Sequence, residues 1–207
     1  MKTSSKLSLP ALAAITSLMA GCAAINPAGL MAARDLDPLG AAPGDIAVAV
    51  GVPRALQLRN GDATFRLSFT VDDGDLDDGG LGAPLEETVA LELSPSAGSG
   101  ITANASDEEV YLARIPAADA PAIAKLQGDI RALRAQGVEG SGALSVAIVG
   151  GCFVGAVPES IAVSTWLQTD PADGFVVLNK RQDLSQALGR ETAALLKEQL
   201  RPCPSNI

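Results

Sequence analysis

The amino-acid sequence predicts a β-rich α+β fold, an antiparallel β-sandwich or sheet of about seven or eight strands with one internal and one C-terminal helix. Three observations support this fold class. Apolar residues alternate with polar ones over several short stretches, which is the period of a half-buried strand. Turn residues separate these stretches at short spacing, which favours antiparallel pairing. Two longer stretches repeat apolar residues every three or four positions, as helices do.

The clearest strand is expected at 64–71, where large apolar residues alternate with polar ones. Asn60-Gly61 precedes it and is a strong hairpin signal, because both residues tolerate positive φ. The alternation at 56–58 is the expected partner across that hairpin. Further strands are expected at 46–50, 89–93, 110–115, 144–148, 161–167 and 175–178.

The internal helix is expected at 120–136, with Asp119 at its N-cap and Gly137 as its terminator. Its apolar residues form one stripe, which either covers the sheet or contacts a partner helix. The stripe of the internal helix consists of Ile123, Leu126, Ile130 and Leu133. The C-terminal helix is expected at 184–200, with Asp183 as its cap.

The composition is that of a globular protein, with 47% hydrophobic against 19% charged residues. Aromatic residues make up only 3%, so we expect a core of Val, Leu, Ile and Ala. The chain has no histidine, which removes the commonest general base and the commonest metal ligand. We therefore expect no enzymatic activity and no cofactor. The net charge of −9, without a basic stripe, argues against a nucleic-acid partner.

The N-terminus has the layout of a secretory signal. Lys2 and Lys6 form a short positive region, and the apolar region 7–18 follows. This apolar region is too short to span a bilayer, which needs roughly 20 apolar residues. We therefore expect it to direct export and then to be removed.

Ala20-Gly21-Cys22 ends this segment and resembles the lipobox of bacterial lipoproteins. In that family the cysteine sulfur carries a diacylglycerol, the signal is cut before the cysteine, and the new amine usually receives a further acyl chain such as palmitate. Met19 stands where the family most often has Leu, and it keeps the position apolar. The resemblance implies a lipid anchor at Cys22. Because Ala23 is not the aspartate that commonly retains lipoproteins in the inner membrane, it also implies the periplasmic face of the outer membrane.

This resemblance divides the chain into three parts. Residues 1–21 are a signal peptide, 22–44 a lipidated N-terminus and flexible tether rich in Ala, Pro and Gly, and 45–207 a single globular domain. The alternative is an ordinary signal peptide that is cut at a nearby alanine, in which case Cys22 has no role.

Cys152 and Cys203 are the remaining cysteines, and an even pair in an exported protein predicts a disulfide. The bridge would attach the C-terminus to the sheet. A redox pair is the alternative, although the two cysteines lack the Cys-X-X-Cys spacing and an adjacent cation.

An acidic segment at 72–80 is the sharpest candidate for a metal site. Asp73, Asp75 and Asp77 have the alternate spacing with which a calcium-binding EF-hand loop begins. Proline at position 84, where the bidentate glutamate should stand, departs from that pattern. We therefore predict a solvated loop without a metal, with calcium at these three aspartates as the weak alternative.

The sequence thus predicts a membrane-anchored periplasmic lipoprotein that acts non-catalytically through contacts with an envelope protein, as an accessory or assembly factor. The alternative is a carrier or binding module for a small or apolar envelope ligand, which an apolar cavity would favour. A hydrolase that uses carboxylates alone is a third hypothesis, and it requires two acids that converge in one cleft.

Overall fold

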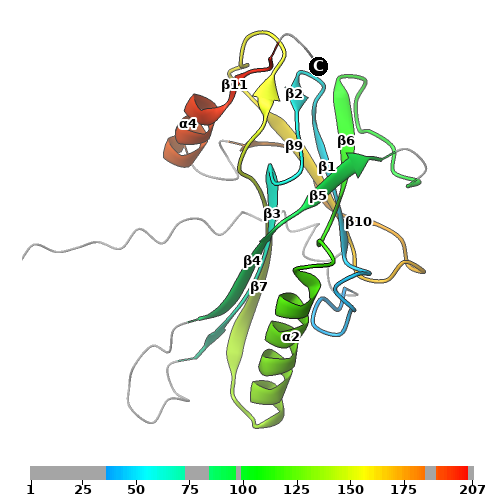
Figure 1. The fold of residues 1–207 in the computed structure, drawn as a ribbon, viewed down its shortest axis with the longest axis vertical. Coiled ribbons are helices and arrows are strands. Elements are labelled where there is room, and N and C mark those ends of the chain that lie inside the picture. The colour runs from blue at the N-terminus through cyan, green and yellow to red at the C-terminus, as the bar shows by residue number, and fades with distance from the viewer. Residues whose placement is uncertain (1–35, 73–83, 97–98, 185–189, 205–207) are drawn as a thin grey trace, which may run out of the picture.

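The structure is a computed structural model that describes residues 36–72, 84–96, 99–184 and 190–204. It contains three sheets and two helices in these ranges, and every strand pair but one is antiparallel. The predicted β-rich α+β fold is therefore confirmed. Figure 1 shows the smallest sheet at one end of the molecule and a helix beside a three-stranded sheet toward the other end.

The largest sheet has five antiparallel strands in the order β10-β9-β1-β6-β5. The central strand β1 is buried along almost its whole length, because it pairs on both edges and is covered on both faces. The strands are β1 (Ala47–Pro53), β5 (Glu92–Pro95), β6 (Glu108–Arg114), β9 (Ala162–Gln168) and β10 (Val176–Asp183).

The second sheet has the order β4-β3-β7. In the middle strand, Phe65, Leu67 and Phe69 are buried while Arg66 between them is exposed, as the predicted alternation requires. Arg66 forms an ion pair with Glu86 on the neighbouring strand. The strands are β3 (Ala63–Val71), β4 (Leu85–Ala90) and β7 (Gly140–Ile148).

Helix α2 (Ala120–Ala135) is the predicted internal helix. Three residues of its apolar stripe are buried and the fourth packs against the same core, so the stripe covers the sheet rather than a partner helix. Asp119 occupies the N-cap, but its side chain makes no capping hydrogen bond. At the other end Gly137 has φ +83°, and the backbone N–H of Val138 donates to the carbonyl of Leu133 at 3.1 Å. The glycine ends the helix because it adopts this conformation without strain.

The hairpin predicted at Asn60-Gly61 is wrong, although the turn itself forms. The Arg59 backbone N–H donates to Asp62 Oδ2 at 2.7 Å, and Gly61 has φ +88°. The preceding strand β2 (Leu56–Gln57) does not pair with β3. It has only two residues, whereas β7 and β4 pair along most of the nine residues of β3. The turn therefore joins two different sheets.

The third sheet is small and has the order β11-β8-β2. It joins β8 (Cys152–Phe153) in parallel to β11 (Arg201–Pro202), which follows the C-terminal helix α4 (Arg190–Gln199). The predicted helix 184–200 agrees with α4 over its described part; 185–189 lie outside the described residues. Neither α2 nor α4 is long and apolar enough to cross a membrane.

The core has two parts, one on each face of the five-stranded sheet. The larger part lies among β1, β3 and α2. The smaller part consists of Ala49, Val110 and Trp166 on the opposite face, with Ile101 and Phe175 packed against them. Trp166 is therefore a packing residue of this second layer.

Candidate functional site

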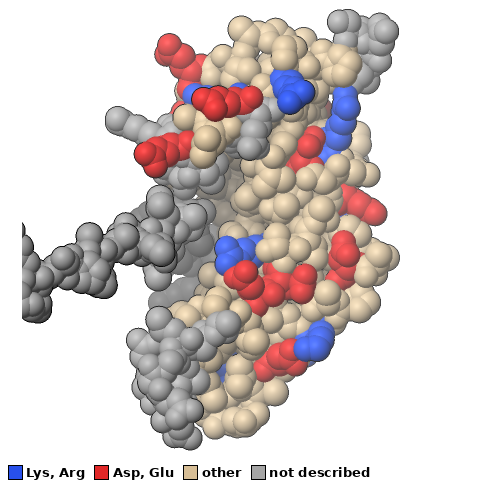
Figure 2. All heavy atoms as spheres, turned by 60° about the vertical axis from the view of Figure 1, so that its left-hand side comes forward, with Lys and Arg blue, Asp and Glu red and all other residues tan. Residues whose placement is uncertain are grey.

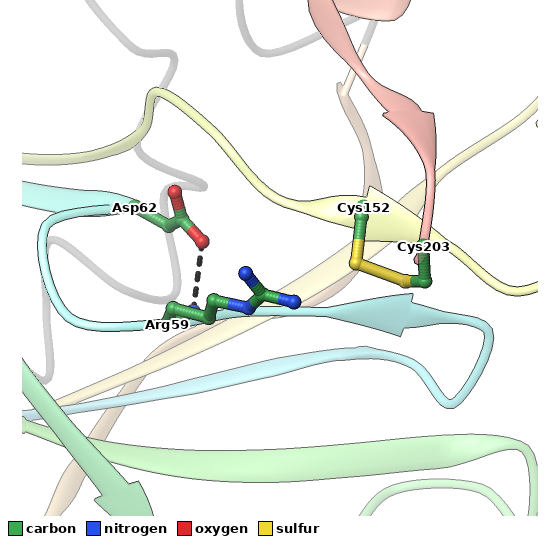
Figure 3. Close-up of a disulfide and its surroundings, with 4 residues drawn as sticks. All are labelled: Arg59, Asp62, Cys152 and Cys203. Atoms are coloured by element: carbon green, nitrogen blue, oxygen red, sulfur yellow. Dashed lines mark hydrogen bonds between the residues drawn. A yellow bond between two sulfur atoms is a disulfide. The ribbon is translucent and has the colours of Figure 1, made fainter. Parts of the chain in front are cut away.

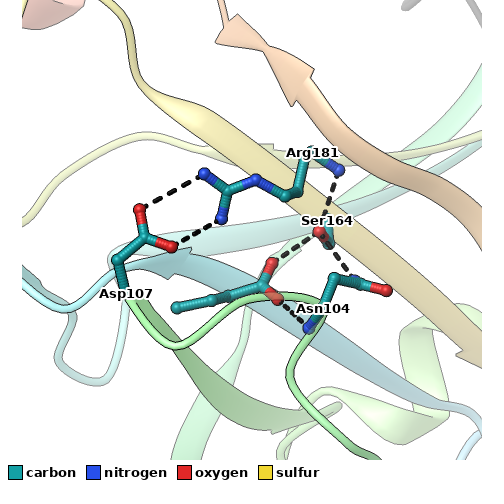
Figure 4. Close-up of polar contacts among 5 residues, drawn as sticks. Asn104, Asp107, Ser164 and Arg181 are labelled. Atoms are coloured by element: carbon teal, nitrogen blue, oxygen red, sulfur yellow. Dashed lines mark hydrogen bonds and ion pairs between the residues drawn. The ribbon is translucent and has the colours of Figure 1, made fainter.

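A buried polar network lies on the face of the five-stranded sheet that carries the smaller core (Figure 4). Glu108 begins β6 and is 2% exposed, and Ser164 of β9 is fully buried. The Ser164 hydroxyl donates to Glu108 Oε1 at 2.5 Å. The backbone N–H of Asn104 donates to the other carboxylate oxygen. Both carboxylate oxygens of Glu108 thus accept a hydrogen bond, which offsets the cost of burying the group.

Ser164 Oγ is the centre of this network. Besides donating to Glu108, it accepts a hydrogen bond from Asn104 Nδ2 at 3.1 Å and another from the Arg181 backbone N–H at 2.9 Å. A hydroxyl has one proton to donate and two lone pairs, so its hydrogen-bonding capacity is used up. The serine therefore ties β6, β9, β10 and the loop before β6 together.

Gly51 of β1 makes room for the Glu108 side chain. In the strand register it pairs with Ser164 on one side and with Val110 on the other. A Cβ atom at this position would lie 2.5 Å from Glu108 Oε1. The glycine is therefore required by the close approach of the carboxylate to the backbone, as glycine in a strand interior often is.

Arg181 and Asp107 form an ion pair at the rim of this network. Both terminal guanidinium nitrogens of Arg181, Nη1 and Nη2, donate to the carboxylate, at 2.9 and 3.2 Å. This hydrogen bonding lowers the pKa of the Asp107 carboxyl below its ordinary value and raises the pKa of Arg181. Arg181 has φ +47° within an irregular part of β10. Its side chain therefore leaves the strand at a local distortion and contacts Asp107.

Cys152 and Cys203 form a disulfide, in agreement with the predicted pairing (Figure 3). Their sulfurs are 2.05 Å apart, and 51 positions separate them in the sequence. The Cys203 backbone N–H also donates to the carbonyl of Phe153 at 2.9 Å. The bridge attaches the C-terminal strand β11 to β8. We call β8, β11, their flanking residues 149–151 and 154 together with α4 the disulfide end.

The disulfide end carries exposed apolar side chains. Val149 and Val154 flank β8 and are 45% and 56% exposed, and Leu195 on α4 is 59% exposed. They are the large hydrophobic residues that the described ranges leave exposed. Lys197 holds α4 in place by donating to the Glu159 carbonyl. These three side chains thus stand on elements that the bridge and the strand pairs hold together.

A pocket of about 310 Å³ lies between α2, β3, β7 and residues 36–39. The buried side chain of Gln127 on α2 donates to the carbonyls of Pro38 and Ala41, at 2.7 and 3.0 Å. Residues 36–41, which the sequence assigned to a flexible tether, therefore lie against the helix. The apolar lining comprises Leu36, Pro38, Leu39, Leu67, Phe69, Ile130, Ala143 and Leu144, and the polar lining Asp37, Ser68 and Arg134.

Charges of both signs are interspersed on the face drawn in Figure 2, where basic side chains stand beside acidic ones. In the ranges that the structure describes, three ion pairs form: Arg66–Glu86, Lys125–Asp129 and Arg181–Asp107.

The other predicted site residues fall outside the described ranges. Cys22 belongs to 1–35, and Asp73, Asp75 and Asp77 belong to 73–83. Within the described ranges, no group of three or more His, Cys, Asp or Glu side chains is arranged to hold a metal ion.

Sequence reasoning missed the Glu108–Ser164 network and the pocket. Gly51 was a usable signal for the network, because a glycine that interrupts an apolar strand marks a close approach. Nothing in the sequence places residues 36–41 against α2, because Gln127 is 89 positions from Pro38 and 86 from Ala41.

Comparison of this chain with protein-family models, with characterised proteins and with solved structures finds no match.

Proposed function

We propose that this protein is a lipoprotein of the cell envelope that acts through protein contacts rather than by catalysis. Acyl chains on Cys22 anchor it to the outer membrane, and the folded part faces the periplasm as an accessory or assembly factor. The observation that supports the contact role is the exposure of Val149, Val154 and Leu195 at the disulfide end.

Large apolar side chains on a rigid element favour a protein partner for an energetic reason. Complete burial of one Val or Leu contributes about 1.5–3 kcal/mol. Stable interfaces place such residues at their centre and surround them with polar groups. The disulfide and the strand pairs of β8 hold Val154 in position, so little ordering would be needed when a partner covers it.

The buried network supports the non-catalytic part of the proposal. In the part of the chain that the structure describes, Glu108 and Ser164 are a buried carboxylate and a buried hydroxyl that are hydrogen-bonded to each other. Ser164 uses its donor and both acceptors within the fold. We therefore assign this pair to the stability of the sheet.

Site-specific crosslinking in intact cells tests this function. A photo-crosslinking residue at Val154 should capture one stoichiometric envelope protein, and the same residue at exposed Lys125 on α2 should not. Leu195→Asp should reduce the capture from position 154 because it places a charge at the contact. Equal capture from both positions, or none from position 154, would contradict the proposal.

A carrier or binding module is the second candidate function, and the pocket beside α2 favours it. Its volume of about 310 Å³ is at the lower end of the range that small-molecule sites occupy, and eight of its twelve lining residues are apolar. A ligand held there would be small, so the function would be delivery or sensing of a small envelope molecule.

A further inference from the structure

The pocket beside α2 has an apolar floor formed by two paired strands. Leu67 of β3 lies opposite Leu144 of β7, so the two side chains lie side by side on the face that looks toward the helix. Ile130 of α2 contributes to the lining from the helix. Leu36 and Leu39 add apolar side chains from the segment that lies against the helix.

Gly142 leaves this floor open. It lies opposite Phe69 in the register, on the same face as Leu144. A Cβ atom built there would meet only Arg134 Nη2 at 3.6 Å and the Ser68 carbonyl oxygen at 3.9 Å, which are ordinary contacts. The hollow thus exists because one residue of the floor has no side chain.

Three hydrogen bonds from α2 hold the outer wall in place, two from Gln127 and one from the Arg131 guanidinium to the Leu39 carbonyl. Gln127 is 2% exposed and donates to two carbonyls of residues 36–41. Asp37, the acidic group in the lining, accepts a hydrogen bond from the backbone N–H of Gly40 at 2.9 Å, so its carboxylate is bonded within its own segment. The wall is therefore preformed, as ligand sites usually are.

Arg134 supplies a positive charge at this pocket. Its guanidinium lies over the ring of Phe69, 5.4 Å from the ring centroid, and next to Gly142. None of the ion pairs formed within the described ranges includes it. A guanidinium that lies over an aromatic face keeps its N–H groups in the plane of the group. It therefore presents them to a carboxylate in the bidentate geometry that both groups favour.

We propose that this pocket binds a small amphipathic carboxylate, with its hydrocarbon chain on the apolar floor and its carboxylate on Arg134. The volume corresponds to about ten water-sized volumes of roughly 30 Å³ each, which suits a medium-chain fatty acid and excludes a whole diacyl lipid. Asp37 in the lining and the net charge of −9 disfavour multiply charged anions such as phosphates. This inference rests on the second proposed function and names its ligand class.

Titration with octanoate at pH 7, where the acid is ionised, tests the proposal. The probe is added to the full chain carrying Cys22→Ser, which has no acyl chains of its own to compete for the pocket. We expect a dissociation constant of about 0.1–1 mM, measured by calorimetry. Octan-1-ol has the same chain without the charge, and we expect it to bind roughly tenfold or more weakly.

Three variants locate the binding. Arg134→Met should lower the affinity for octanoate to that for octanol and leave octanol binding unchanged, whereas Arg134→Lys should retain part of the difference. Lys125→Met on the same helix removes an equal charge away from the pocket and should change neither affinity. Gly142→Val should abolish binding of both molecules, and its melting temperature should show that the strand accommodates the β-branched side chain.

The outcomes separate this inference from the function on which it rests. If octanoate and octanol bind equally and Arg134→Met has no effect, the carboxylate assignment is wrong although a carrier for neutral apolar ligands remains. If neither molecule binds, or if Gly142→Val leaves binding unchanged, the pocket is not a ligand site and the carrier function fails with it.

Discussion

The Ser164 hydroxyl donates a 2.5 Å hydrogen bond to the buried carboxylate of Glu108, across the backbone of Gly51. One side chain begins β6 and the other lies in β9, and β1 runs between them. The bond therefore links β6 and β9, the two strands that flank β1, on the face of the sheet that carries the smaller core.

Ser164→Ala should destabilise the fold. The change leaves a buried carboxylate oxygen without its donor and removes the acceptor of two further hydrogen bonds. We expect the free energy of unfolding to fall by about 1.5–3 kcal/mol in urea denaturation. Ser141→Ala on the exposed start of β7 is the matched control and should change it by less than about 0.5 kcal/mol. Equal effects of the two changes would show that the network contributes no specific stability.

Gly51→Ala should also destabilise the fold, because its methyl group would lie 2.5 Å from Glu108 Oε1. The carboxylate must then move away from Ser164, at a cost of about 1–3 kcal/mol. Gly128→Ala in α2 has open space and should instead stabilise the helix by about 0.5–1 kcal/mol. Thermal unfolding of both variants checks the opposite signs, and a neutral Gly51→Ala would argue against the close approach.

The fold was predictable where local patterns decide it. The alternation of β3 and the spacing and glycine terminator of α2 specify their elements without long-range information. The predicted hairpin at Asn60-Gly61 is wrong because turn residues determine the turn but not which strand pairs with the next one. Strand β3 pairs with β7 along its whole length instead of with β2. Of the candidate sites, the disulfide followed from counting cysteines. The network and the pocket depend on which distant segments meet, and a single sequence does not encode that in a local pattern.

The Asp107–Arg181 ion pair predicts a dependence of stability on pH in acid. Hydrogen bonding to Arg181 lowers the pKa of Asp107 below its ordinary value of 3.8. A carboxyl with a lowered pKa in the folded state contributes stability above its unfolded pKa, and that contribution is lost as the pH falls through the folded pKa. NMR titration of the Asp107 carboxyl should give a midpoint below 3.8 that rises in Arg181→Met. An unchanged midpoint in the variant would assign the shift to another cause.

Reduction of the disulfide should destabilise the protein as a whole. The bridge closes a loop across 51 positions, which corresponds to about 4 kcal/mol on the chain-entropy model. The double variant Cys152→Ser/Cys203→Ser should lose a similar amount in urea denaturation. Intact-mass analysis without reductant should show this cysteine pair two hydrogens lighter than the reduced form, and two free thiols would refute the bridge.

The central claim, that a lipid on Cys22 anchors this protein in the envelope, is tested most directly by mass spectrometry of the N-terminal peptide. Trypsin cleaves after Arg34, so the mature protein should release a peptide that spans 22–34. We predict that this peptide begins at Cys22 and carries the mass of a diacylglycerol and a further acyl chain, and that Cys22→Ser releases the protein from membranes. An unmodified peptide, or one that begins at another residue, would contradict the claim and leave the protein as an ordinary exported one.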